Sequence, residues 1–546
     1  MTANTLEIVR AKPPGNHMLG RKYTGRFDGG SDEHSNEVSR ERRIPGHAVL
    51  DILSTDPLSL YARSSPTALA CIELATCRHW NYRDLDLDVQ RAVTVLRQEG
   101  VTRGDRVAVI WHNSVYLLIL QQALMRLGGI FIPLNWRLSS LELSRLLADS
   151  TPRLLYTEDS LPVLPPNCRK LCIANLAAAI DAAEPAPPCP PPSMNDVCMM
   201  LYTSGTSGHP KGVLITPQFL LATAVNFTAL GDVCGSSVFL VDAPMFHVIG
   251  GATSIWPELM CGGSILISPG FKAEVTNDRL ADPALGITHY FCVPQMAEAL
   301  RLAYNFDPGQ WRSLVALFTG GAPNPKANIH RWLDFGVRVV DGYGMTETGT
   351  TLGMPLSSEL IRAKAGSVGK PGPLTEIRIV DDLGRDLTDG TPGEILISGL
   401  NVTTGYWNRT EERDGVYTAD GWLRTGDIGR RDEDGYIFIL DRKKDVFISG
   451  GENIYPVEVE AALMEHPGVR EVAVVGVPNE RWGEVGQAYI VTTSDRPLLH
   501  AELEQHCRAL IAPFKAPKAF IFVDSLPRTG SGKVMKHLLE KPTPAK

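Results

Sequence analysis

A short segment rich in hydroxyls and glycines constrains this chain more than any other feature: residues 202–212 read YTSGTSGHPKG. Glycines let a backbone curl so that successive N–H groups point inward, and the hydroxyls and Lys211 add donors and a positive charge. Such a concavity suits a polyphosphate. It is not a Walker A loop, because Pro210 stands where that pattern has glycine and Gly212 replaces its Ser/Thr. Residues 213–216 predict a strand, so loop amides and not a helix N-terminus would hold the phosphates.

This segment resembles the phosphate loop of the adenylate-forming superfamily, which includes acyl- and aryl-CoA synthetases, peptide-synthetase adenylation domains and firefly-type luciferases. Further motifs of that family follow in the family's order, so the resemblance covers nearly all of the chain beyond residue 45. It implies an enzyme that joins a carboxylic acid to AMP, expels pyrophosphate and passes the acyl group to a thiol, with ATP, Mg²⁺ and coenzyme A. The ATP-binding residues that it implies in this loop are Thr203, Ser204, Gly205, Thr206 (also catalytic), Ser207, Gly208 and Lys211.

Size and composition exclude several classes of protein. A chain of 546 residues exceeds one ordinary core, so two or more domains are expected. A hydrophobic content of 44% and a charged content of 21% are typical of a soluble globular protein, and the net charge of −8 argues against nucleic-acid binding. Ten scattered cysteines without CxxC pairs favour free thiols in a reducing compartment over a disulfide framework or a zinc site.

No stretch reads as a transmembrane span; the nearest candidate, residues 116–134, is interrupted by polar residues and glycines. The N-terminus lacks a signal-peptide core, and we expect a cytoplasmic protein. Five basic residues and one acidic residue among the first 26 leave an organellar transit peptide as the alternative. The final residues PTPAK are not a peroxisomal signal. The sequence is silent on oligomeric state, and a homodimer stays open.

The pattern of strands and helices predicts an α/β fold. Arg106–Ile110 is an expected strand, 114–127 a helix and 130–133 a strand, which is the rhythm of parallel sheets covered by helices. Residues 374–440 instead predict short strands between Asp-Gly turns, hence a small β-barrel-like unit. The expected strands there are 377–380, 394–398 and 436–440; further on, strands 472–477 and 520–523 flank a helix at 499–511.

These patterns predict three parts. Residues 1–45 form a flexible N-terminal extension, because they are polar and rich in glycine and charge. Residues 46–443 form a large AMP-binding domain of βα subdomains that includes the β-rich unit. Residues 444–546 form a small, mobile α+β lid domain that carries the catalytic lysine.

Three motifs in the large domain resemble the family's nucleotide-binding segments. The first, DGYGMTE at 341–347, resembles YGxTE; the resemblance implies Tyr343 at the adenine, Gly344 as a further ATP-binding residue and Thr346 at the phosphates. Glu347 would be catalytic and bind Mg²⁺, which prefers oxygen donors. The second, GGAP at 320–323, resembles the adenine-contacting loop. The third, WLRTGD at 422–427, resembles WxxTGD. The remaining residues implied are Gly321 and Ala322 at the adenine and Asp427 at the ribose hydroxyls.

Two motifs near the C-terminus resemble the segments that the family uses in its two successive half-reactions. In DRKKD at 441–445, Arg442 would lie near the ribose and Lys444 would be the hinge. Gly450 and Gly451 would let backbone approach the pantetheine arm of coenzyme A, and Lys533 would bridge the acid's carboxylate and the α-phosphate. Lys533 and the Gly450-Gly451 loop belong to the same small domain, so the resemblance implies that this domain rotates between the half-reactions.

The segment PMFHVIGG at 244–251 gives information on the class of carboxylic acid that would be the substrate. It resembles PxFHxxG of acyl-CoA synthetases, and the resemblance implies a catalytic His247 between the acyl pocket and the thiol tunnel. The other expected lining stretches, 317–320 and 348–354, carry no charge, which fits a fatty or aromatic acid. A medium- or long-chain fatty acid, and thus fatty acid metabolism, is the expected substrate class.

Two alternatives remain open: a cinnamate- or benzoate-like aryl acid, or loading of a separate carrier protein. Free coenzyme A is favoured because no carrier domain follows in the sequence. A degenerate, non-catalytic nucleotide-binding protein is disfavoured, because Glu347, Asp427, Arg442 and Lys533 are all present.

Overall fold

The computed structural model describes residues 56–158, 164–187, 189, 193–203, 210–409, 413–449, 452–493, 498–528 and 534–539. The predicted extension 1–45 lies outside the described residues, and its prediction stands as made. Eight predicted site residues also lie outside the described residues: Ser204, Gly205, Thr206, Ser207, Gly208, Gly450, Gly451 and Lys533.

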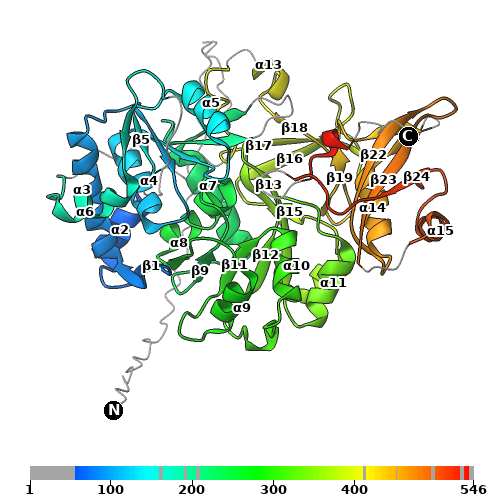
Figure 1. Ribbon diagram of the computed structural model, residues 1–546, viewed down its shortest axis with the longest axis horizontal. Coiled ribbons are helices and arrows are strands. Elements are labelled where there is room, and N and C mark those ends of the chain that lie inside the picture. The colour runs from blue at the N-terminus through cyan, green and yellow to red at the C-terminus, as the bar shows by residue number, and fades with distance from the viewer. Residues whose placement is uncertain are drawn as a thin grey trace, which may run out of the picture. The chain divides into compact units, whose positions relative to one another are not determined.

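Two β-sheets with helices between them and outside them make up most of the described chain (Figure 1). The first has the order β6-β5-β3-β4-β7-β8 and is parallel except for β8. Its strands are β3 (Arg106–Ile110), β4 (Ile130–Leu134), β5 (Leu154–Tyr156), β6 (Arg169–Leu171), β7 (Met199–Thr203) and β8 (Lys211–Ile215).

The second sheet has the order β15-β14-β13-β12-β11-β9-β10-β1-β2, and its six central strands, from β13 to β1, all pair in parallel. Its antiparallel edges are β2 on one side and β14 and β15 on the other. The strands are β1 (Leu69–Glu73), β2 (Arg78–Asn81), β9 (Val238–Val241), β10 (Ser264–Ile267), β11 (His289–Cys292), β12 (Ala316–Thr319), β13 (Val339–Met345), β14 (Gly349–Gly353) and β15 (Lys370–Pro371).

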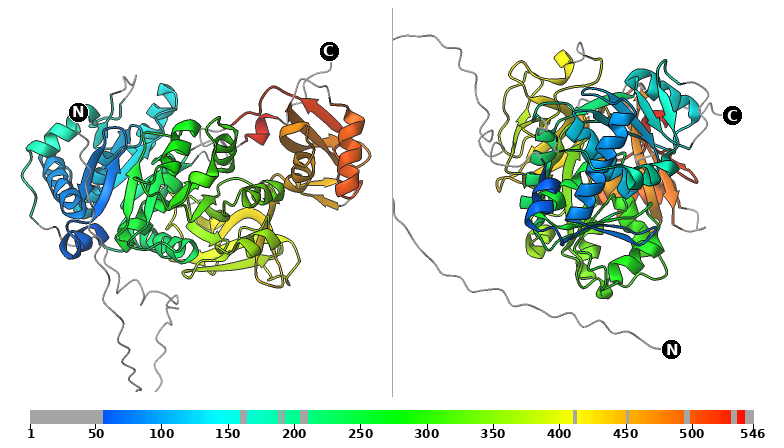
Figure 2. Two further views of the ribbon diagram at one scale, coloured as in Figure 1. Left: turned by 90° about the horizontal axis from the view of Figure 1, so that it is seen from below. Right: turned by 90° about the vertical axis from the view of Figure 1, so that its left-hand side faces the viewer.

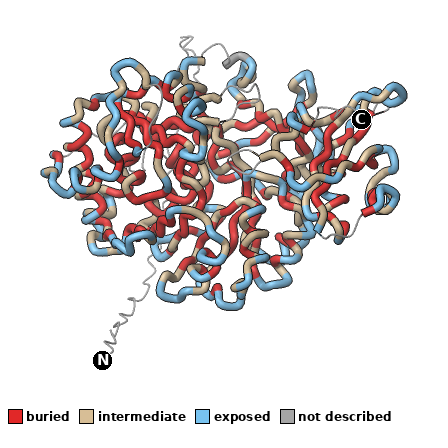
Figure 3. The backbone as a smooth tube through the Cα atoms, in the orientation of Figure 1, coloured by how far each residue is buried: buried red, intermediate tan, exposed pale blue. Residues whose placement is uncertain are grey.

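A shared hydrophobic core lies between the two sheets, made of helices that pack against both. Helix α4 (Val115–Leu127) shows why the sequence forms such an element: Ser114 accepts a hydrogen bond from the amide of Tyr116 at its start. Gly128 ends it in the left-handed conformation, φ 71°. Figure 3 shows the buried backbone of these strands and helices in red. The other helices of this layer are α3 (Tyr82–Gln98), α6 (Leu176–Ala182), α7 (Pro217–Gly231) and α8 (Trp256–Cys261).

Helices also cover the outer faces of both sheets. Helix α5 (Ser140–Ser150) packs on the outer face of the first sheet, and α9, α10 and α11 pack on the second (Figure 1). The bounds of the remaining helices here are α2 (Pro57–Ser64), α9 (Ala273–Ala281), α10 (Pro294–Leu302), α11 (Lys326–Asp334), α12 (Ser358–Ala363) and the short η1 (Ile173–Asn175) and η3 (Pro308–Gln310).

The region predicted to be β-rich is a four-stranded antiparallel sheet in the order β16-β17-β18-β19. Three strands fall where the sequence places them. The fourth, β18, contains the TGD motif and was missed, because its glycines and polar residues indicated a turn. The elements are β16 (Thr375–Val380), β17 (Gly393–Gly399), α13 (Arg413–Val416), β18 (Leu423–Arg431) and β19 (Ile437–Arg442).

The C-terminal residues form a sheet in the order β21-β20-β23-β22, with β24 parallel to β23. Helices α14 and α15 pack on one face of this sheet, and Figure 2 (left) shows α15 in orange beside the strands. The elements are β20 (Phe447–Ser449), β21 (Glu452–Ile454), α14 (Pro456–Met464), β22 (Val469–Asn479), β23 (Gly483–Thr492), α15 (His500–Leu510), β24 (Ala519–Phe522) and η4 (Lys536–Leu538).

The expected α/β architecture is confirmed: a large part with mostly parallel sheets and a smaller C-terminal part. The expected strand at 106–110 and helices at 114–127 and 499–511 match β3, α4 and α15 within a residue. No helix among the described residues has the length and apolarity needed to cross a bilayer.

An ion cluster ties three helices of the large part together. Arg126 on α4 is only 8% exposed; its Nε lies 2.7 Å from Asp56 Oδ2, and its Nη2 contacts Asp86 on α3. Asp56 also caps α2 by accepting from the Ser59 amide. Burial works against the charge of Arg126, but the two carboxylates outweigh it and raise its pKa.

We expect Arg126→Met to cost about 3–5 kcal/mol in free energy of unfolding, because it leaves the buried carboxylate of Asp86 and the partly buried one of Asp56 without their cation. Urea denaturation followed by tryptophan fluorescence measures this. The control is Arg153→Met, which removes an exposed pair with Asp105 at 3.8 Å and should cost less than about 1 kcal/mol. Equal losses in the two variants would contradict the assignment.

Candidate active site

The phosphate-loop motif joins two antiparallel strands. Thr203 at the end of β7 pairs with Lys211 at the start of β8, so both lie at the base of a hairpin whose connection, 204–209, is outside the described residues. The predicted strand after the loop is confirmed as β8, followed by Thr216 as the cap of α7. A Cβ on Gly212 would lie 2.5 Å from the sulfur of Met200, which explains the glycine there.

A third segment completes this hairpin and was not anticipated from the sequence. Tyr406 bridges Val213, and the Trp407 amide donates to the Gly212 carbonyl at 2.8 Å. Lys211 Nζ lies 5.1 Å from the centroid of the Tyr406 ring. The run GYW at 405–407 carries no charge and no catalytic residue type, so only its pairing along β8 reveals its place.

Tyr406 links the phosphate loop to the TE motif. Its hydroxyl donates to Glu347 Oε1 at 3.0 Å, and the backbone carbonyl of Glu347 accepts from the Thr403 amide at 2.8 Å. Glu347 lies at the turn between β13 and β14 and is 9% exposed. A nearly buried carboxylate held by one hydroxyl is an oxygen donor of the kind that Mg²⁺ prefers, so the residue fits the predicted metal.

Three further predicted residues meet at one carboxylate. The hydroxyl of Tyr343 donates to Asp427 Oδ2 at 2.5 Å, and Arg442 Nε lies 2.8 Å from Asp427 Oδ1. Asp427 and Arg442 are opposite each other on β18 and β19, while Tyr343 comes from β13 in the large sheet. Tyr343 thus meets Asp427, 84 positions further along the chain, and shares that carboxylate with Arg442, 99 positions further along.

Burial shapes the charges of this trio. It raises the pKa of the Tyr343 phenol well above its usual value, and the negative charge of Asp427 adds to the effect. Tyr343 is therefore a neutral donor at any physiological pH. For Arg442, burial opposes the charge, but the attraction of Asp427 outweighs it and raises the pKa. The site thus holds a permanent cation beside a carboxylate.

The predicted adenine loop lies at the carboxyl end of β12. A Cβ on Gly320 would lie 3.1 Å from the Gly342 carbonyl, and one on Gly321 would contact the side chain of Ile249 at 3.6 Å. Gly321 has φ 79°, which favours glycine. Gly321 and its neighbour Ala322 therefore stand between the YGMTE segment and the segment that contains His247.

Asp341 is a residue of this region to which the sequence assigned no role. Its Oδ1 accepts from the Thr319 hydroxyl at 2.9 Å, and that hydroxyl oxygen accepts from Asn324 Nδ2 at 3.2 Å. Burial raises the pKa of Asp341 to about 8, although its hydrogen bonds with the Thr319 hydroxyl and the Gly342 backbone work in the opposite direction. The side chain is therefore a neutral carboxyl at neutral pH. Its place in the motif, directly before GYG, was the available signal.

His247 lies where β9 leads into a π-helix, η2 (Ile249–Thr253). Its amide donates to the Pro244 carbonyl at 3.0 Å, and its ring lies 4.6 Å from that of Phe246. Gly250 and Gly251 pack so tightly that an added Cβ would meet carbonyl oxygens at 2.3–2.5 Å. The segment is thus folded closely on itself beside Ile249 and Gly321.

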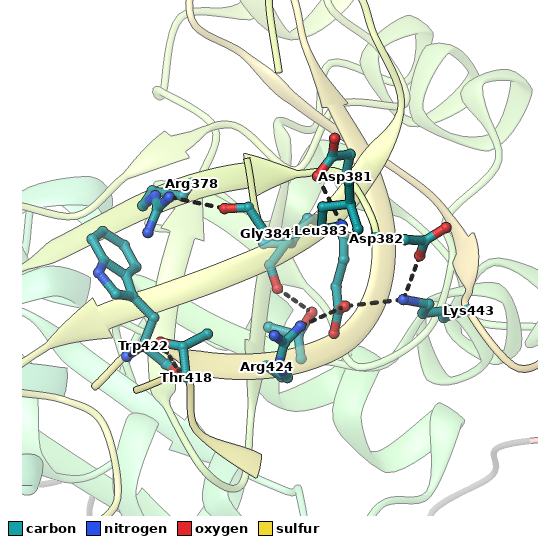
Figure 4. Close-up of polar contacts among 12 residues, drawn as sticks. Arg378, Asp381, Asp382, Leu383, Gly384, Thr418, Trp422, Arg424 and Lys443 are labelled. Atoms are coloured by element: carbon teal, nitrogen blue, oxygen red, sulfur yellow. Dashed lines mark hydrogen bonds and ion pairs between the residues drawn. The ribbon is translucent and has the colours of Figure 1, made fainter. Parts of the chain in front are cut away.

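The predicted hinge begins where the four-stranded sheet ends. Lys443 is held there: its Nζ lies 2.9 Å from Asp382 Oδ1 and 3.3 Å from Glu394 Oε2, which also contacts Arg424 (Figure 4). Lys444, the next residue, is exposed. The polar contacts of Lys443 fix the chain on one side of the position predicted to pivot.

A carboxylate reaches across this position. Asp441 Oδ2 accepts from the amide of Val457 in the first turn of α14 at 2.8 Å. Burial raises the pKa of Asp441 to about 6, and nearby Lys536 partly counters the effect.

Fold and site define an adenylate-forming enzyme. Residues 59–407 match the family model described as AMP-binding enzyme, and residues 458–533 match the one described as AMP-binding enzyme C-terminal domain. The chain belongs to the AMP-binding enzyme family, and within it to the acid–thiol ligases that form acyl- or aryl-CoA with release of AMP.

Among its relatives is a protein named feruloyl-CoA synthase from Amycolatopsis sp, 38% identical over 87% of this chain and 96% of that protein. Another is the long-chain-fatty-acid–CoA ligase FadD13 of Mycobacterium tuberculosis, 34% identical over 88% of this chain and 96% of its own. Among solved structures, o-succinylbenzoate CoA synthetase (MenE) of Bacillus subtilis with the acyl-adenylate OSB-AMP has a TM-score of 0.80. It is 29% identical and covers 90% of this chain and 99% of its own; it has also been solved with ATP and magnesium.

We expect Asp341→Asn to stabilise the protein increasingly as pH rises from 5 to 8. The folded-state pKa of Asp341 is raised, so the wild type loses stability as pH climbs from the unfolded value near 4 to about 8, whereas Asn does not titrate. Asn also keeps an oxygen for Thr319. Urea denaturation at pH 5, 6.5 and 8 should show the gap between variant and wild type widening by at least about 1.4 kcal/mol, the value of one pKa unit. Parallel pH profiles would show that Asp341 is already ionised in the fold.

Proposed function

We propose that this chain is an ATP- and Mg²⁺-dependent acyl-CoA synthetase that works in two half-reactions. A carboxylic acid attacks the α-phosphorus of ATP to give acyl-AMP and pyrophosphate, and coenzyme A then displaces AMP to give the thioester. Its partners are small molecules: the acid, ATP and coenzyme A. A carrier protein would replace coenzyme A only in the alternative in which the thiol belongs to a phosphopantetheine arm.

The observation that carries this proposal is the meeting of Tyr343, Asp427 and Arg442 from three separate motifs at one buried carboxylate. A carboxylate with two oxygens in a fixed place can accept from both ribose hydroxyls. We assign the adenine to Tyr343 and the loop of Gly321 and Ala322. MenE, a structural neighbour with a TM-score of 0.80, holds an acyl-adenylate, which supports a nucleotide site in this fold.

The phosphates are assigned to the other end of the site. We place them at the hairpin loop with Thr203 and Lys211 at its base, beside Thr346 and Glu347. Mg²⁺ bound at Glu347 would neutralise phosphate charge and thereby lower the repulsion that a carboxylate meets when it approaches ATP. Tyr406 donates its hydroxyl to Glu347 Oε1, which restrains the orientation of the proposed metal ligand.

The two half-reactions need different groups at the same place. We propose that Lys533 neutralises the charge that develops during adenylation, and that Gly450 and Gly451 admit the pantetheine arm afterwards. Both belong to the lid domain, residues 444–546, so a rotation about Lys444 would exchange them. The contacts of Lys443 with Asp382 and Glu394 support a pivot directly after it, because they hold the preceding residue to the sheet.

Two substrate classes are supported by specific relatives. An aromatic acid is supported by the feruloyl-CoA synthase and by an indoleacetate–CoA ligase at 36% identity. A medium- or long-chain fatty acid, the expectation from the sequence, is supported by FadD13, which is named for long-chain fatty acids, at 34% identity. We place the aromatic acid first, because the relatives named for aromatic acids have the higher identities.

Pyrophosphate release with ATP, Mg²⁺ and single acids tests the adenylation step directly. We expect release with ferulate, indole-3-acetate or dodecanoate, and AMP release that rises when coenzyme A is added. Release of pyrophosphate that coenzyme A fails to turn into thioester would favour the carrier-protein alternative. No release of pyrophosphate with any member of a broad library of aryl and alkyl acids would refute the proposal.

The lid assignment has its own test. We expect Lys533→Ala to lower the rate of adenylation about 10²–10³-fold, the value of one fixed charge-stabilising donor, and to spare thioester formation from a supplied acyl-adenylate. Rapid-quench measurement of the two half-reactions separates the effects. Lys518→Ala in the same part of the chain serves as the control. Equal losses in both half-reactions would contradict a role confined to adenylation.

A further inference from the structure

The segment that contains His247 is held by side chains from a neighbouring helix, and this inference rests on the proposed function. Residues 243–253 leave β9 and enter the π-helix η2, where the Ser254 amide donates to the Ile249 carbonyl at 2.9 Å, five residues earlier. π-helical turns are rare and frequently lie at functional sites. Two side chains from outside the segment contact its backbone.

Asn113 supplies the first contacts. It is 6% exposed and directly precedes the cap residue Ser114 of α4. Its Nδ2 donates to the Ala243 carbonyl at 2.8 Å, and its Oδ1 accepts from the Met245 amide at 2.8 Å. One amide group thus satisfies a donor and an acceptor of the chain just before His247, which fixes both the position and the direction of that backbone.

Gln121 supplies the second contact, two turns further along α4. It is 4% exposed, and its Nε2 donates to the Gly251 carbonyl in the π-helix at 2.9 Å. The same nitrogen lies 4.0 Å from the sulfur of Met199 on β7, the strand that leads into the phosphate loop. Gln121 therefore stands between the strand of the phosphate loop and the segment assigned to the acid.

Gln122, the neighbour of Gln121, is a buried glutamine that makes no hydrogen bond to the π-helix within the described part of the chain. Gln122 is fully buried, and neither its Oε1 nor its Nε2 has a hydrogen-bond partner among the described residues. The two glutamines share a helix, a size and a chemistry, and differ in that only Gln121 contacts the π-helix. This pair offers a matched comparison within one turn.

We propose that Asn113 and Gln121 are positioning residues for the carboxylic acid: from α4 they clamp residues 243–251 and so set where His247 and the acid lie relative to the phosphate loop. Neither side chain touches a reacting atom in this assignment. Their effect passes through the backbone of Ala243, Met245 and Gly251, which they bind on both sides of His247. The nucleotide site at Asp427 depends on neither of them.

The kinetic test compares Gln121→Met with Gln122→Met, using ferulate and dodecanoate as probe acids. Loss of one buried hydrogen bond of about 1 kcal/mol or somewhat more predicts an increase of about five- to tenfold in KM for the acid in Gln121→Met. KM for ATP should stay within about twofold, because the ATP contacts are elsewhere. Gln122→Met should match the wild type in both constants. Asn113→Leu should raise KM for the acid further, since it removes two hydrogen bonds.

Hydrogen exchange gives a readout that does not need turnover. We expect the peptide covering residues 243–254 to exchange faster in Gln121→Met and Asn113→Leu than in the wild type and Gln122→Met, with the other β-sheet peptides unchanged. Equal exchange in all four proteins, or KM values for acid and ATP that rise together in Gln121→Met, would overturn the clamp. Wild-type protein that releases no pyrophosphate with any acid would instead refute the proposed function, and the exchange comparison would still decide whether α4 holds the segment.

Discussion

The carboxylate of Asp427 is the contact on which the arrangement of the site depends. It is nearly buried, and an isolated buried charge is costly, so its two oxygens must be satisfied by nearby donors. Tyr343 and Arg442 satisfy them, one from the large parallel sheet and one from the adjacent strand of the four-stranded sheet. The compensation of one charge thus links a strand of the second sheet to two strands of the four-stranded sheet.

The layered architecture explains why the other site residues gather near this contact. The carboxyl ends of parallel strands share one edge of a sheet, so loops that are distant in sequence become neighbours there. β12 ends at the glycine loop of Gly320 and Gly321, and its neighbour β13 in the second sheet runs into the turn of Glu347, whereas β7, which ends at the phosphate loop, belongs to the first sheet. Helix α4, between the two sheets, contacts both the strand of the phosphate loop and the π-helix through one side chain, Gln121. The core layer therefore also serves to align the site.

Sequence patterns predicted much of the fold but not all of it. β3 and α4 were predictable because their hydrophobic periodicity and the cap at Ser114 agree with their burial. β18 was not, because its motif WLRTGD has four consecutive polar residues or glycines and no alternation of apolar residues, and its partners are on β17 and β19. Tyr406 and Asp341 were not assigned roles for a related reason. A tyrosine or an aspartate acquires its function from the groups around it, and no local pattern announces those groups.

The order of motifs in the sequence determined the class of chemistry, because phosphate, ribose and metal each require particular donors, acceptors and charges that only a few residue types supply. The hydrophobic periodicity of the sequence determined the alternation of strands and helices, since burial of one face of an element imposes a period on the chain. Tertiary structure alone decided which of those residues meet: that Tyr343 and Arg442 share Asp427, that Tyr406 orients Glu347, and that Gln121 binds the π-helix while Gln122 does not. The reason is physical. Hydrogen bonds and ion pairs act over a few ångströms, and the distances between residues far apart in the chain exist only once the sheets and helices have packed.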